Sequence, residues 1–335
     1  MYHSHFKGNH FEIGFRWGAL LAERGNFILN HVPFPLTEER RSFAAQCLPY
    51  YQTYFPAILE EIRGIAAGQH CTASSLQTVL FSMYAMPPAC CCSCFAVSNS
   101  KTILLGRNSD FVPDLEKWNQ NVIYRFSSGS YAFTGNTTAF LEMEDGVNEK
   151  GLAIGLTVVY PRIHIKKPGL NAGMLLRLML ETCSSTKEAV HLLQAVPIGS
   201  SQTFTLADGN GELAVVECNA DKIAVLPSST SRAYACATNV FHSNAFLSSS
   251  YINTWQSEER YQTMDSALKT NAIHMDIAGA IELLSGKKGF LCQYDRATGT
   301  DTVWSVLYDL KNKCIYRAEG NPSRKKFRTD MRFYF

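Results

Sequence analysis

The sequence changes character at one junction, residues 86–95, and this change constrains the fold more than any other feature. Before it, residues 11–85 carry apolar side chains at helical spacing, clearest at Ile58, Ile62 and Ile65. From Phe95 onward, short β-rich runs alternate with turns. Two prolines at the junction favour an exposed, extended segment. Four cysteines follow within five positions: Cys90, Cys91, Cys92 and Cys94.

The part of the chain after the junction predicts antiparallel sheets. Its strongest local signal is a hairpin, in which β-rich runs at 203–206 and 213–217 flank turn residues at 208–211. Helical patterns interrupt the strands at 173–196 and 276–284. Strands linked by hairpins, with helices grouped elsewhere, indicate an α+β fold whose sheets bury one face against each other and the other against helices. We therefore expect one large catalytic domain behind a mostly helical leader.

The composition is that of an ordinary enzyme. The chain has 335 residues, of which 46% are hydrophobic, and its formal charge of +2 arises from 31 basic and 29 acidic residues spread along it. This charge pattern predicts no nucleic-acid partner, and the basic stretch at 323–328 is interpreted as a solvated tail. We expect no signal peptide and no membrane segment. Eleven cysteines, an odd number, do not suggest a disulfide framework, so we expect a cytoplasmic location.

The cysteine cluster indicates a thiol nucleophile at the start of a strand, and two routes could activate it. One is a histidine base, for which His242 is the best of the nine histidines, although its context is more typical of a loop or core residue. The other is self-activation: a cysteine that becomes a chain terminus uses its own α-amine, with a pKa of about 8, as the base. The thiol can itself cut the peptide bond that precedes the cysteine, by an N-to-S acyl shift followed by hydrolysis of the thioester.

Other interpretations of the same cysteines compete with this one. Cys91 and Cys94 form a C-x-x-C pair, which keeps a thiol redox protein open as an alternative. A zinc site would need a second pair of ligands, and His70 and Cys71 are adjacent residues with poor ligand spacing, so no metal is predicted. Otherwise the cysteines beside the nucleophile are small apolar packing residues.

At this point two segments of the sequence resemble a known family. Residues 92–97 and 106–111, with Asp110 placed 18 residues after Cys92, are similar to the start of the mature chain in N-terminal-nucleophile (Ntn) hydrolases of the penicillin acyltransferase type, peptidase family C45. Choloylglycine hydrolases and penicillin V acylases are relatives of that family. The spacing selects Cys92 over its neighbours. The resemblance continues in order through 61–68, 146–152, 238–239, 257–260, 304–306 and 320–322.

The resemblance implies an αββα sandwich of antiparallel sheets between helical layers. It also implies a leader, residues 1–91, that is removed by autoproteolysis between Cys91 and Cys92 and stays bound to the catalytic chain, residues 92–335. The implied function is hydrolysis or transfer of an acyl group from a linear amide C–N bond through a thioester on Cys92.

The resemblance assigns roles near the nucleophile. Cys92 would attack the acyl carbonyl, and its freed α-amine would carry the proton to the leaving amine. Asp110 would hold that amine by a hydrogen bond, and Arg107 would favour the thiolate. Without the family pattern, an ordinary ion pair at a strand end explains Arg107 and Asp110 as well as a catalytic role does.

Three further residues are assigned by the same resemblance. Asn239 would donate to the oxyanion, and Arg260 would support the same polar cluster. Thr157 lies near the position where bile-salt hydrolases carry an asparagine, so its backbone amide would help to stabilise the oxyanion. Its side chain differs from the asparagine of those enzymes. Taken singly, Asn239 could also be a turn residue and Arg260 a solvated helix residue.

The expected partners are small molecules. We expect an acyl amide or acyl thioester as substrate, with acyl-CoA as an alternative acyl donor, and we expect no cofactor. The cleaved leader would be the partner chain, and a homo-oligomer is left open. A catalytically inactive binding protein on the same fold is the remaining alternative.

Overall fold

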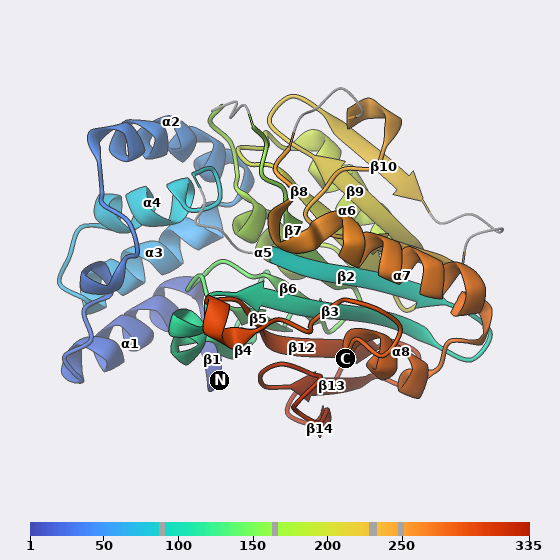
Figure 1. Ribbon diagram of the computed structural model, residues 1–335. Helices are drawn as coiled ribbons and strands as arrows, with labels where there is room; N and C mark the ends of the chain where they lie inside the picture. Colours follow the sequence, from blue (N-terminus) through green and yellow to red (C-terminus); the bar gives the residue numbers. More distant parts are fainter. Residues whose placement is uncertain (87–90, 163–166, 228–232, 247–250) are drawn as a thin grey trace.

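Two β-sheets face each other in the computed structural model of the protein, and helices cover their outer faces (Figure 1). The structure describes residues 1–86, 91–162, 167–227, 233–246 and 251–335. Cys90 and the prolines at 87–88 lie outside the described residues. Helices α5 and α6 pack on one sheet, and α7 and α8 pack on the other. The expected α+β fold and αββα layering are confirmed.

The first sheet has eight strands in the described part of the chain. In spatial order they are β1 (Tyr2–Gly8), β4 (Gln120–Phe126), β5 (Phe133–Thr137), β6 (Asp145–Asn148), β7 (Ala153–Val158), β8 (Gln202–Ala207), β9 (Leu213–Cys218) and β10 (Ile223–Pro227). The predicted hairpin is confirmed as β8 and β9. The second sheet has six described strands, in the order β11 (Tyr234–Ala237), β2 (Cys91–Ser98), β3 (Ile103–Phe111), β12 (Asp301–Asp309), β13 (Cys314–Ala318) and β14 (Arg328–Asp330).

The helices of the described chain fall into two groups. The leader carries α1 (His10–Glu23), α2 (Glu38–Tyr54), α3 (Pro56–Gly68) and α4 (Ala73–Ser82), which gather at one side of the sandwich in Figure 1. The remainder carries α5 (Ala172–Thr182), α6 (Thr186–Ala195), α7 (Ser257–Asn271) and α8 (Ile277–Leu284). None of these helices is both long and apolar enough to cross a membrane.

Three details differ from the sequence-based expectations. The leader begins with a strand, and β1 pairs in parallel with β4, so the first sheet is not wholly antiparallel. The strand is mostly polar and alternates exposed and half-buried residues, so it carries no run of buried apolar residues that would indicate a strand. The helix expected over 173–196 is two helices, because the Ser185 hydroxyl caps the start of α6. Helix α7 was not predicted, because its buried stripe is narrow, at Arg260, Met264 and Leu268.

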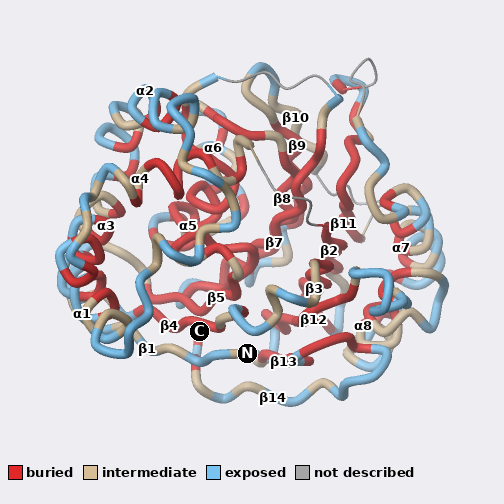
Figure 2. The backbone as a smooth tube through the Cα atoms, turned by 60° about the vertical axis from the view of Figure 1, so that its left-hand side comes forward, coloured by how far each residue is buried: buried red, intermediate tan, exposed pale blue. Residues whose placement is uncertain are grey.

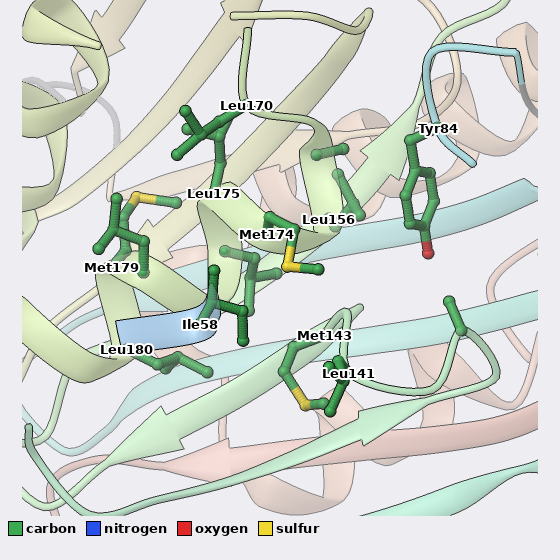
Figure 3. Close-up of a cluster of buried hydrophobic side chains, with 14 of the residues drawn as sticks. Ile58, Tyr84, Leu141, Met143, Leu156, Leu170, Met174, Leu175, Met179 and Leu180 are labelled. Carbon is green, nitrogen blue, oxygen red and sulfur yellow. The ribbon is translucent and has the colours of Figure 1, made fainter. Parts of the chain in front are cut away.

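Leader and catalytic segment share one hydrophobic core. Figure 3 shows Ile58 of α3 and Tyr84 beside Met174 and Leu175 of α5, with Leu156 of β7 nearby. Figure 2 shows that the inner strands of both sheets and parts of the leader helices are buried, whereas the strands β1 and β14 are not. A cut after residue 91 would therefore leave two chains that bury a common apolar surface.

Glycines explain the family-like segment 61–68 in the leader. A Cβ at Gly64 would collide with the carbonyl oxygen of Phe11, and one at Gly14 with that of Glu61, so α1 and α3 pack backbone against backbone. This close approach leaves the Glu61 side chain buried and turned toward the catalytic segment, where it binds Arg177 and Tyr124.

Candidate active site

Cys92 lies near the start of β2, in the middle of the second sheet. It pairs with Ser109 of β3, and alternation along the strand sends its side chain toward the opposing sheet. The preceding residue, Cys91, points the other way, where its Sγ bonds the Thr254 hydroxyl at 3.1 Å. The two adjacent thiols therefore occupy different environments on opposite faces of one strand.

Arg107 of β3 links the Cys92 thiol to the first sheet. Its guanidinium donates to Cys92 Sγ at 2.7 Å, to an Asp145 carboxylate oxygen at 3.0 Å and to Glu144 at 3.3 Å, and it is fully buried. Burial by itself lowers the pKa of Arg107, but the nearby Cys92, Asp145 and Glu144 raise it overall. The thiol therefore faces a permanent positive charge, and a positive charge favours thiolate.

Asn239 follows β11 and holds the backbone of the same cysteine. Its Oδ1 accepts the backbone N–H of Cys92 at 2.9 Å, and its Nδ2 donates to the Val158 carbonyl at 2.7 Å. An amide nitrogen carries two hydrogens, so the bond to Val158 uses one of them and the other is available to a bound group. Asn239 thus contacts the nitrogen that self-cleavage would turn into an amine.

Arg260 of α7 binds several polar groups around Cys92. Its guanidinium donates to the Cys92 carbonyl at 2.7 Å, to the Ser93 hydroxyl at 2.8 Å and to Asn239 Oδ1 at 2.9 Å. It also lies 3.5 Å from the Asp110 carboxylate. The arginine is fully buried and binds the backbone of Cys92, whereas Arg107 binds its thiol.

Asp110 lies on this second side, across the ladder from Cys91. Its carboxylate accepts hydroxyl hydrogen bonds from Thr302 at 2.6 Å and Tyr294 at 3.1 Å. Burial raises its pKa to about 6 despite the opposing effect of Arg260. In the intact chain the Cys92 N–H donates to Asn239, so the contact between Asp110 and the nucleophile's amine stays a prediction for the cleaved chain.

A family comparison can now be set beside this geometry. Residues 97–324 match the acyl-coenzyme A:6-aminopenicillanic acid acyl-transferase family, which is well over half of the chain. The chain belongs to this family. The resemblance seen in the sequence is therefore confirmed. The matched region contains Arg107, Asp110, Asn239 and Arg260, and it starts five residues after Cys92.

Solved structures agree on the fold of this family member. A single-residue variant of the conjugated bile acid hydrolase from Clostridium perfringens has a TM-score of 0.50 and 14% identity, covering 72% of this chain and 97% of its own. A Caenorhabditis elegans N-acylethanolamine-hydrolyzing acid amidase ortholog has a TM-score of 0.49 and 16% identity, covering 65% of this chain and 93% of its own. The first of these supports the Ntn-hydrolase fold. No curated protein sequence matches the chain.

Thr157 lies next to the carbonyl that Asn239 binds, on β7. Its hydroxyl is buried and donates to the Thr238 carbonyl at 2.7 Å, and it also contacts the Thr203 hydroxyl. The side chain is thus used to join β7, β8 and the end of β11. An oxyanion role for its backbone amide stays a prediction.

The other cysteines of the cluster suit packing better than chemistry. Burial raises the pKa of Cys91 to about 11 and that of Cys94 to about 12. Their side chains lie on opposite faces of β2, since Cys91 meets Thr254 while Cys94 packs against Gly155 of the other sheet. No disulfide joins any two of the described cysteines. A disulfide between these two positions would require β2 to be rebuilt, which argues against the redox hypothesis.

His242, the candidate histidine base, belongs to a different cluster. Its ring stacks on Tyr261 with the centroids 3.5 Å apart, and its backbone N–H donates to Glu217 at 2.6 Å. Arg107, Asn239 and Arg260 contact Cys92. Among the described residues, no group of three His, Cys, Asp or Glu side chains is arranged to bind a metal ion.

Sequence reasoning missed the acidic pair and the strained turn of this site. Glu144 and Asp145 directly precede the family-like segment at 146–152, so the resemblance begins one residue after Asp145 and includes neither acid. Trp255 and Gln256 have φ values of 49° and 54°, in the left-handed region that non-glycine residues rarely adopt. This turn directs the Trp255 carbonyl to Arg260 at 2.9 Å. No glycine or asparagine marks it in the sequence.

Proposed function

We propose that the protein is a self-processing cysteine amidohydrolase or acyltransferase that works through a thioester on Cys92. The observation that carries the proposal is that two side chains bind this residue at different atoms. Arg107 binds its Sγ at 2.7 Å, and Asn239 binds its backbone nitrogen at 2.9 Å. These are the two atoms that an N-terminal nucleophile uses, one as the attacking group and one as the base.

The first proposed reaction is cleavage between Cys91 and Cys92. The Cys92 Sγ attacks the carbonyl carbon of Cys91, the C–N bond breaks, and the nitrogen leaves as the amine of Cys92. Water then hydrolyses the resulting thioester, which leaves a carboxylate on Cys91 and restores the thiol. Asn239 already holds the nitrogen that becomes the amine.

The second proposed reaction uses the groups that the first one frees. The Cys92 thiol gives its proton to its own α-amine, whose pKa is about 8 in an unperturbed chain, and attacks the amide carbonyl of a substrate. The α-amine passes the proton to the leaving amine, and the acyl group remains on Sγ as a thioester. Attack by water completes hydrolysis, and attack by a second amine completes transfer. In this proposal the second N–H of the Asn239 amide, which the bond to the Val158 carbonyl does not use, stabilises the oxyanion.

Intact mass spectrometry tests the self-cleavage directly. The wild-type protein should appear as two chains, residues 1–91 and 92–335, whereas Cys92→Ala should remain a single chain. Cys91→Ala is the matched control, because it removes the adjacent thiol on the opposite face of β2 and should still be cut. A Cys92→Ala protein that is cut as fast as the wild type would overturn the proposal.

A substrate panel tests the acyl chemistry. N-acyl amino acids, penicillin V, conjugated bile salts and acyl-CoA with an amine acceptor cover the expected acyl donors. An acyl adduct should accumulate on the peptide that begins at Cys92, and hydroxylamine should release it as a hydroxamate. A cleaved protein that gives no adduct with any member of the panel would favour a binding role for the fold.

A further inference from the structure

A cavity of about 710 Å³ lies beside β1, α1 and α4, where the leader meets the catalytic segment. In Figure 1, α1 and α4 both lie on the leader side of the molecule, and β1 lies next to α1. Residues 137–140, which belong to the segment after residue 91, form another part of the cavity lining. Neither Cys92 nor Arg107, Asn239 and Arg260, which contact it, is among the lining residues, so the cavity is distinct from the thiol site. Its volume is in the range of small-molecule binding sites, roughly 300–1,000 Å³.

One wall of the cavity is aromatic and held in place. The Trp17 ring lies 4.2 Å from the stacked ring of Phe140 and 5.1 Å from that of Phe6, measured between centroids. Phe140 has a φ of 69°, an uncommon conformation for a residue with a side chain, and its ring is fixed by the stack. Leu76, Val79 and other apolar side chains complete the interior: Ile13, Leu21, Ile28, Leu80 and Met83.

The charged side chains that line the cavity are all basic. Lys7, Arg16 and Arg24 contribute to the lining, together with three histidines, and no aspartate or glutamate of the described chain does. Arg16 and Arg24 are exposed, so they stand at the rim rather than in the interior. Tyr2 and Leu20, which also line the cavity, are 60% and 45% exposed, so the apolar surface continues to the mouth.

We infer that this cavity binds a single-chain anionic amphiphile. The apolar chain lies against the aromatic wall, and the carboxylate or phosphate head binds Arg16 and Arg24 at the rim. Arginine suits such a head because its planar guanidinium donates two parallel hydrogen bonds to carboxylate or phosphate. A cation of the same chain length meets like charge at the same place and is excluded. The inference does not rest on the thiol chemistry, because the cavity is lined by other residues.

The inner end of the cavity is linked to the thiol by hydrogen bonds. Thr138 lines the cavity, and its backbone N–H donates to Glu144 at 2.9 Å. The other carboxylate oxygen of Glu144 accepts from Arg107 at 3.3 Å, and Arg107 binds Cys92 Sγ at 2.7 Å. A bound ligand that shifts the segment around Thr138 therefore changes the surroundings of Arg107. Cys92 alkylation rates measure this link without any substrate.

Calorimetric titration of the full-length Cys92→Ala chain tests the binding. Dodecanoate below its micelle concentration should bind at one site per chain, and dodecylamine, the matched cation, should bind at least about tenfold more weakly. The double variant Arg16→Gln/Arg24→Gln should weaken dodecanoate binding by a similar factor. The matched control Arg41→Gln/Arg63→Gln removes two exposed arginines that do not line the cavity and should bind normally.

Further titrations distinguish the possible head groups of the ligand and show whether it binds in the cavity. Dodecyl phosphate binding more tightly than dodecanoate would indicate a phosphate head, and the reverse a carboxylate. Equal binding of dodecanoate and dodecylamine, or unaltered binding in the Arg16→Gln/Arg24→Gln variant, would overturn the inference. So would binding to anionic lipid vesicles with no binding of the monomeric amphiphiles, since the surface and not the cavity would then be the site. Circular dichroism checks that each variant is folded.

Discussion

Asn239 accepts the backbone N–H of Cys92 over 2.9 Å, so the nitrogen of the proposed nucleophile is held before any peptide bond is cut. The same Oδ1 atom accepts from Arg260, and Nδ2 donates to the Val158 carbonyl. One amide side chain thus joins β2, α7 and the end of β7. The oxygen binds the Cys92 N–H and the nitrogen is the proposed oxyanion donor, so substitutions can separate the two roles.

Asn239→Asp should separate positioning from oxyanion stabilisation. The aspartate keeps an oxygen for Cys92 N–H and Arg260 but lacks the Nδ2 donor, so self-cleavage should slow by roughly 10²- to 10³-fold while the fold is retained. Asn239→Ala loses both ends and should slow cleavage at least as much. Gel time courses of the freshly expressed chains measure the rates. Asn219→Ala, a turn residue outside the site, is the control. Equal rates for Asn239→Asp and wild type would exclude the oxyanion role.

Arg107→Met should lower both thiol reactivity and stability. It leaves the buried Asp145 carboxylate without its arginine, and breaking a buried pair in this way typically costs about 3–5 kcal/mol of unfolding free energy. Iodoacetamide should also alkylate Cys92 more slowly, since the neighbouring positive charge is gone. Urea unfolding and peptide mapping measure the two effects.

The double variant Arg107→Met/Asp145→Leu separates these two losses. It removes the unpaired carboxylate, so part of the stability should return while the Cys92 alkylation rate stays low. A return of the alkylation rate together with stability would show that Arg107 acts on the thiol only through the fold.

The fold was predictable where local pattern and tertiary structure agree. The hairpin of β8 and β9 has turn residues between two β-rich runs, and every level of the sequence favours the same structure there. Strand β1 was not predictable in this way, because its pairing partner β4 lies more than a hundred residues further along the chain. Exposed polar residues such as His3 and His5 give the segment no hydrophobic alternation from which a strand could be predicted.

The site was predictable where a residue belongs to a recognisable local segment. Cys92, Arg107 and Asp110 lie within twenty residues of each other, and one strand pair brings them together. Glu144 and Asp145 reach Arg107 from the opposing sheet, so only the packing of the two sheets shows that they belong to the site. Long-range ion pairs of this kind leave no periodic signal in a single sequence.

The cleaved leader should stay bound to the catalytic chain. Arg177 of α5 forms buried ion pairs with Glu61 of the leader at 2.5 Å and with Glu181 at 2.8 Å, and Tyr124 donates to the same Glu61. Strand β1 adds a ladder of hydrogen bonds to β4. Size-exclusion chromatography after cleavage should show both chains in one peak. They should separate only under denaturing conditions.

Glu61→Ala should weaken this retention. It leaves the Arg177 guanidinium buried without one of its carboxylates, so the leader should dissociate at a lower urea concentration than in the wild type. Glu60→Ala is the matched control, because Glu60 is the exposed neighbour on the same helix and pairs only with solvent-exposed Arg63. If the leader of the wild-type protein leaves in plain buffer, the retained-subunit prediction is wrong.

Asp110 should make the uncut protein less stable as the pH rises from about 4 to about 6. Burial raises its pKa from 3.8 to about 6, so in this interval the folded chain binds more protons than the unfolded chain, and the free energy of unfolding falls with increasing pH. The full difference corresponds to about 3 kcal/mol as an upper value.

Asp110→Asn, made in the Cys92→Ala chain, has no proton to lose and should gain stability relative to its parent over this interval. Urea unfolding at four pH values from 4 to 7 measures the difference, with the exposed Asp114→Asn as control. A constant difference between variant and parent across these values would mean that Asp110 is already ionised at pH 4, which would leave Arg260 as the dominant influence on its charge.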